Sequence, residues 1–192
     1  FSQLAREVAA EMKPYETHLP TLVAPRVFDR IIRSTCDPKS HESINVLLDH
    51  ILSNARDIGR SRTMSIFQNY ALGSANFVKT YAIPSPFKTS SLIVEHDLPV
   101  LSTNNCERLL SASVNKEIRP VVFTARPSLP PGGVRDDAHY YSPEAELAVE
   151  LVGLDSIPLI ASGRTEWLAW KTGADPHTFI KPALVHALAA IA

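Results

Sequence analysis

The chain has 192 residues, 45% of them hydrophobic and 20% charged, which is the composition of an ordinary globular protein large enough to bury a core. Its formal net charge of -1 gives no electrostatic reason to expect binding to nucleic acid or to an anionic membrane. No apolar run approaches the roughly 20 residues that a membrane span requires, and no signal peptide is apparent.

The cysteine content indicates a reducing compartment. Cys36 and Cys106 are the only cysteines, and two cysteines do not make a disulfide framework. We therefore expect free thiols and a cytoplasmic protein. The chain begins at Phe1 and ends in the apolar run HALAAIA with no C-cap residue, so we expect it to be a piece of a longer protein.

The first 82 residues have the apolar periodicity of helices. Apolar residues recur at helical spacing in residues 1–12, 26–33 and 42–72, and a connector over residues 14–25 separates the first two of these segments. The prolines at 84 and 86 then interrupt the helical pattern. The sequence therefore predicts a helical N-terminal domain over residues 1–84 and a second domain over residues 85–192.

From residue 90 onward, predicted strands alternate with predicted helices. The strands are SLIVE (91–95), RPVVFTA (119–125), SIPLIAS (156–162) and TFI (178–180). Helices follow them over residues 104–113, 142–153, 163–173 and 181–192, with Gly153 and Gly173 just past two of the helix ends. This alternation predicts an α/β domain with a mostly parallel, Rossmann-like sheet flanked by helices.

Polar residues follow each predicted strand. They are Glu95 and Asp97 after the first strand, Thr124 and Arg126 after the second, Arg164 after the third and Lys181 after the fourth. Ligands of open parallel sheets gather at the carboxyl ends of the strands. This mixture of carboxylates, hydroxyl and cations suits an anionic substrate held with a divalent cation.

Three motifs in this region resemble those of the haloacid dehalogenase superfamily, over roughly residues 90–192. LIVEHDLPVL is similar to the first motif, VVFTARP to the second and FIKPALVHAL to the third. The resemblance implies a Mg²⁺-dependent phosphatase of a small phosphorylated metabolite. It places Glu95 in the nucleophile position and Asp97 in the acid/base position, with both near the metal, and it places Thr124 and Lys181 on the phosphate.

Two departures from the family pattern leave a second hypothesis open. Glu95 stands where the family has an aspartate, and misplacing a reacting atom by about 1 Å can cost on the order of 10²-fold in rate. The fourth, acidic metal-binding motif has no counterpart before Ala192. The alternative to the enzyme is a catalytically degenerate domain that binds a ligand or a partner protein.

Structural interpretations compete with these functional ones. Glu95 and Asp97 are also typical of a solvated strand end, and Thr124 of ordinary strand packing. The polar loop at residues 127–144 suits a substrate lid, a metal site or a plain surface loop. Arg26, Arg30 and Arg33 share a helix face that either binds a phosphate-bearing ligand or is simply solvated. An apolar stripe on the helical domain makes a homodimer a further hypothesis.

Overall fold

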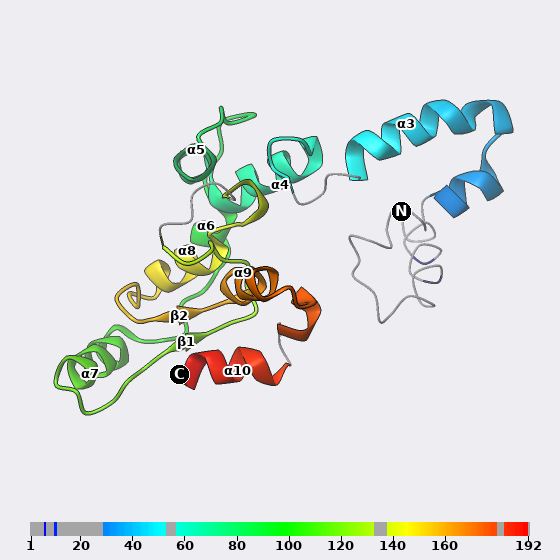
Figure 1. The fold of residues 1–192 in the computed structure, drawn as a ribbon. Helices are drawn as coiled ribbons and strands as arrows, with labels where there is room; N and C mark the ends of the chain where they lie inside the picture. The colour runs from blue at the N-terminus through cyan, green and yellow to red at the C-terminus, as the bar shows by residue number, and fades with distance from the viewer. Residues whose placement is uncertain are drawn as a thin grey trace. The chain divides into compact units, whose positions relative to one another are not determined.

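The computed structural model describes residues 6, 10, 29–52, 57–132, 138–179 and 183–191. The chain divides into two compact units, Phe1–Ile66 and Phe67–Ala192, and helices make up most of the described residues (Figure 1). The boundary expected after residue 84 separates two domains that would each fold on their own, and it stays a prediction.

The described part of the first unit is helical, as the sequence predicted. Residues 29–35 form a helix, followed by the 3₁₀ helix η2 (Pro38–Ser40) and by α3 (His41–Leu52). The helical pattern of residues 42–72 is interrupted by a turn at residues 57–60, where the Asp57 carboxylate accepts a hydrogen bond from the Gly59 amide at 2.9 Å. Most of residues 1–28, including the connector, lies outside the described residues.

Two helices follow this turn and end where the sequence predicted a break. They are α4 (Arg62–Leu72) and α5 (Ser74–Tyr81), joined at Gly73, which has a φ of 75°. The segment after α5 is fixed to α4 by the fully buried Asn69, whose Nδ2 donates to the Phe87 carbonyl at 2.8 Å. Ser85 in turn donates to Asn69 Oδ1 at 2.8 Å.

The first predicted strand is a helix instead. Residues Leu92–His96 form the short helix α6, and the side chain of Ser91 caps it by accepting from the Val94 amide at 3.2 Å. The same hydroxyl donates to the Ala71 carbonyl at 2.8 Å, which fixes the start of α6 against α4. A short apolar run fits a strand and a buried helix turn equally well. Here the Ser91 cap stabilises the helix. The predicted strand at residues 178–180 is also wrong where described, because Pro176–Phe179 form the 3₁₀ helix η4.

The second and third predicted strands are confirmed, although they are short. Strand β1 (Val122–Phe123) pairs in parallel with β2 (Leu159–Ile160), with Val122 opposite Leu159. Helix α8 (Glu144–Leu151) connects them and packs on the pair through Ala145 and Val149.

The predicted helices of this unit are also confirmed. They are α7 (Thr103–Val114), α8, α9 (Ser162–Thr172) and α10 (Leu184–Ile191), and the 3₁₀ helix η3 (Ala138–Tyr140) precedes α8. Gly173 caps α9 in the left-handed conformation, with a φ of 69°. Helix α10 contacts both strands, and Figure 1 shows α8 and α10 on either side of them.

The expected fold class is therefore wrong. A mostly parallel, Rossmann-like sheet needs several paired strands, but the described residues contain a two-stranded sheet within a mostly helical fold. The physical reason is that two of the four apolar runs taken as strands form helical turns, each started by a residue that favours a helix N-terminus. Ser91 does so for α6, and Pro176 for η4.

Candidate functional site

The carboxyl ends of β1 and β2 meet, as the strand-end rule predicted. The Thr124 amide donates to the Ile160 carbonyl at 3.0 Å, which continues the ladder past β1. The Arg126 carbonyl then accepts from both the amide and the hydroxyl of Ser162, at 3.1 and 2.9 Å. These bonds hold the loop after β1 against the first turn of α9.

Three of the predicted site residues lie together at this strand end. The Arg126 guanidinium forms an ion pair with the Asp97 carboxylate, with Nη2 and Oδ2 2.7 Å apart. Thr124 Oγ1 accepts from the Arg126 amide at 3.1 Å. Asp97 is the C-cap residue of α6, so it reaches β1 from a helix end and not from a neighbouring strand. Glu95 lies on α6 with an exposed side chain.

This arrangement does not fit the magnesium ion that the motif resemblance implies. A cation already contacts the Asp97 carboxylate, and Glu95 and Asp97 are on a helix and its cap. Within the described ranges, no group of three or more His, Cys, Asp or Glu side chains is arranged to hold a metal. Mg²⁺ dependence therefore stays a prediction of the motif resemblance.

The remaining predicted site residues lie elsewhere. Arg164 is in the first turn of α9, half-buried, and its Nε is buried without a hydrogen-bond partner among the described residues. Its charge acts on Glu146 of α8. Lys181 lies outside the described residues, so its predicted role as a phosphate ligand stays a prediction.

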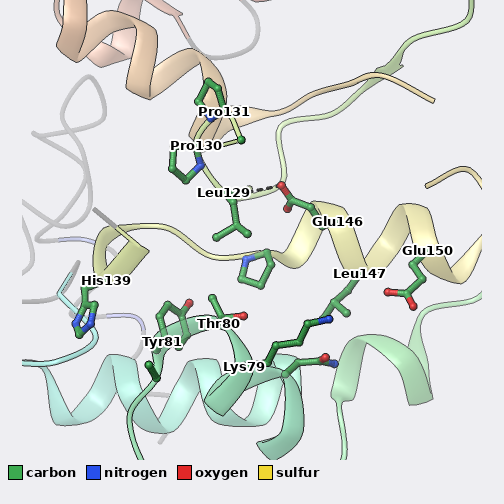
Figure 2. Close-up of a pocket in the computed structure, with 14 residues that line it drawn as sticks. Lys79, Thr80, Tyr81, Leu129, Pro130, Pro131, His139, Glu146, Leu147 and Glu150 are labelled. Carbon is green, nitrogen blue, oxygen red and sulfur yellow. Dashed lines mark hydrogen bonds between the residues drawn. The ribbon is translucent and has the colours of Figure 1, made fainter. Parts of the chain in front are cut away.

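A cavity of the second unit lies between α5, α8 and the loop after β1, and Asp97 is not among its lining residues. It has a volume of about 720 Å³. Figure 2 shows Leu129, Pro130 and Pro131 on the loop side, with Lys79, Thr80 and Tyr81 on α5 across from them. The other lining residues are Asn76, Ala82, Gly132, His139, Pro143, Glu146, Leu147 and Glu150.

Glu146 is the unusual side chain in the wall of this cavity. Its Oε1 accepts a hydrogen bond from the Leu129 amide at 3.1 Å (Figure 2). Its Oε2 is buried and has no hydrogen-bond partner in the described part of the chain. Burial raises the pKa of the Glu146 carboxyl, and the hydrogen bonds from its own amide and from Leu129, together with the charge of Arg164, oppose that rise. A carboxyl whose pKa is raised by burial in a cavity wall marks a candidate site.

The Tyr81 hydroxyl has a structural partner. It donates to the Tyr141 carbonyl at 2.9 Å and so joins α5 to the segment before α8. Burial raises the pKa of Tyr81 well above its usual range, which keeps the hydroxyl protonated. The ring packs edge-on against Phe77 and His139, with centroids 5.1 and 6.4 Å away. Tyr81 therefore forms a fixed wall of the cavity.

Sequence reasoning missed Lys79, Tyr81, Glu146 and Glu150. Their positions in the sequence are those of ordinary polar residues on amphipathic helices, and no motif contains them. The available signal was the loop at residues 127–144. Its described residues Leu129–Gly132 and His139 do line the cavity, while the interpretation of the loop as a lid stays a prediction.

Comparisons with known proteins give no assignment. No family model, no curated protein and no solved structure matches this chain. Among the helices in the described residues, none has the length and apolar character needed to cross a membrane.

Proposed function

We propose that the second unit is a small-molecule binding module whose ligand occupies the cavity between α5, α8 and the loop at residues 127–132. Ligand pockets are typically about 300–1,000 Å³ in volume, mostly apolar, with a few polar groups that orient the ligand. This cavity of about 720 Å³ is lined by leucine and proline side chains and by a comparable number of polar and charged ones. It therefore has the size and the chemistry of a ligand site.

The observation that carries the proposal is the Glu146 carboxyl. Burying a carboxyl opposes its ionisation and lowers stability at neutral pH. Here the carboxyl is held by the Leu129 amide in the wall of a cavity, with its second oxygen lacking a protein partner among the described residues. A ligand that donates one hydrogen bond to this oxygen would satisfy it.

This proposal develops the binding alternative rather than the enzyme. Phosphoryl transfer needs a nucleophile aimed at phosphorus and a free acid/base group. Glu95 is exposed to solvent, and Asp97 is engaged by Arg126. Neither side chain lines the cavity of Figure 2.

A Mg²⁺-dependent phosphatase acting on a small phosphorylated metabolite is the second candidate. The approach of Asp97, Arg126 and Thr124 supports it, because that strand end is where the motif resemblance places the phosphate. The test is phosphate release from a panel of phosphorylated metabolites with Mg²⁺, comparing wild type with Glu95→Asp and Asp97→Asn. Release by wild type that Asp97→Asn abolishes supports this candidate. If neither wild type nor any variant releases phosphate, this candidate is excluded.

The binding proposal is tested by a thermal-shift screen with amino acids, short peptides, sugars, nucleosides and carboxylic acids. A ligand present at 100 times its dissociation constant stabilises the folded state by about 2.7 kcal/mol. Thr80→Trp places a large ring in the cavity and should abolish the shift. Val78→Trp, on the same helix but outside the cavity lining, should retain it. Equal shifts in both variants would contradict the proposed location.

The setting of the protein is part of the proposal. Cys36 and Cys106 are both free thiols, which supports a reducing, cytoplasmic location. A homodimer remains a hypothesis, which sedimentation of the whole chain would test.

A further inference from the structure

Two opposite charges line the cavity without neutralising each other. Lys79 is in the last turn of α5 and Glu150 is near the end of α8, and both side chains are exposed. In the described residues neither forms an ion pair. Figure 2 shows Lys79 extending from α5 toward α8, so the two charges face the cavity from different helices.

The wall between these charges is apolar. Leu147 lies on α8 between Glu146 and Glu150, and Leu129, Pro130 and Pro131 line the loop side of the cavity (Figure 2). The other polar groups of the lining include Tyr81 and Glu146, and Glu146 Oε2 has no hydrogen-bond partner among the described residues. Tyr81 donates to Tyr141, and the Leu129 amide occupies Glu146 Oε1.

We propose that the cavity selects a zwitterionic ligand with an apolar body, of the class of a short apolar peptide with free ends. This inference rests on the proposed binding function of the same cavity. The ligand carboxylate contacts Lys79, its ammonium contacts Glu150, and its apolar side chains contact Leu129, Leu147 and the prolines. Such a ligand satisfies both charges at once, whereas an anion or a cation satisfies one and leaves the other opposite an uncharged group.

The two charges set selectivity more than total affinity. Contacts between exposed charged groups are worth roughly 0.2–1 kcal/mol, which corresponds to a change in affinity of up to about five-fold per charge. Removing one end charge of the ligand should therefore lower its affinity by up to that factor. Removing both charges should lose the sum of the two binding free energies.

The experiment is calorimetric titration of the whole chain with four forms of dileucine. They are the free peptide, its N-acetyl form, its C-terminal amide and the doubly blocked form. We expect the free peptide to bind wild type most tightly and the doubly blocked form most weakly. Lys79→Gln should abolish the preference for a free carboxylate, and Glu150→Gln the preference for a free ammonium. Lys88→Gln and Glu107→Gln, which replace exposed charges outside the cavity, should leave both preferences intact.

The outcomes separate this inference from the function on which it rests. If the doubly blocked peptide binds wild type as tightly as the free peptide, the inference of a zwitterionic ligand is wrong and the cavity remains a binding site. If no dileucine form binds but another compound stabilises the protein and Thr80→Trp abolishes that effect, the ligand class is again wrong. If no compound binds at all, both the inference and the proposed function fail.

Discussion

The Glu146 carboxylate accepts a hydrogen bond from the Leu129 amide at 3.1 Å, which joins helix α8 to the loop that follows β1. Both residues line the cavity between α5, α8 and this loop (Figure 2). The hydrogen bond also gives a partner to the Leu129 amide, a backbone donor in a half-buried segment that would otherwise have none.

Removing the acceptor at Glu146 should cost stability. A buried donor left without a partner costs about 1–3 kcal/mol. Glu146→Ala should therefore be less stable than Glu146→Gln by about that amount, because glutamine keeps an oxygen for the Leu129 amide. Urea unfolding of the two variants measures the difference. The matched pair Glu107→Ala and Glu107→Gln, at an exposed position of α7, should differ by only a few tenths of a kcal/mol. Equal stability of the two Glu146 variants would show that the bond contributes nothing.

The raised pKa of Glu146 should appear in the pH dependence of stability. The unfolded carboxyl releases its proton near pH 4.5, while the folded one retains it to higher pH. The folded state then binds more protons than the unfolded state, so this group lowers stability as pH rises from about 4.5 through the folded pKa. Glu146→Gln has no ionisable carboxyl at this position, so it does not lose this stability. Its stability relative to wild type should rise across that window in urea titrations, and a relative stability that falls with pH would contradict the burial argument.

Gly163 should not tolerate a side chain. A Cβ on Gly163 would lie 2.8 Å from the carbonyl carbon of Ser128 and 2.9 Å from its hydroxyl oxygen. Ser128 is fully buried, so the loop cannot easily move away. Gly163→Ala should destabilise by about 1–3 kcal/mol, or more if the loop detaches. Gly132→Ala, where a Cβ meets nothing within 4 Å, is the control and should change stability little. Comparable thermal melts for both variants would contradict the close packing of loop and helix.

The ion pair between Asp97 and Arg126 should be weak. Their side chains are 35% and 40% exposed, and exposed pairs usually contribute about 0.2–1 kcal/mol. A double-mutant cycle with Asp97→Asn and Arg126→Gln should give a coupling energy in that range, and it should shrink with added salt. A coupling of several kcal/mol that is insensitive to salt would show a desolvated ion pair, contrary to the exposure of the two side chains.

The sequence predicted the elements with strong end signals. Gly173 ends α9 as expected, and the helix predicted over residues 104–113 is α7. The prediction failed at residues 91–95, because the short apolar run Leu92–Val94 fits a strand or a helix turn equally well. The hydrogen bond from Ser91 to Ala71, twenty residues away, is a tertiary contact that no local pattern contains.

The sequence did not identify the cavity. It placed Asp97, Thr124 and Arg126 after predicted strands, and these three side chains lie together at the end of β1, outside the cavity lining. The cavity could not be predicted, because α5 precedes the loop and α8 by more than forty residues and meets them only in the folded chain. Glu146 in particular acquires its raised pKa from burial, which depends on that packing.

The most direct test of a binding module is the position of the ligand. Methyl NMR of the whole chain, titrated with the compound that gives the largest thermal shift in the screen, reports it residue by residue. We expect shifts at the methyl groups of Leu129 and Leu147, which line the cavity, and none at Leu168 and Leu184, which do not. Shifts at Leu168 or Leu184 with Leu129 and Leu147 unchanged would contradict the binding proposal.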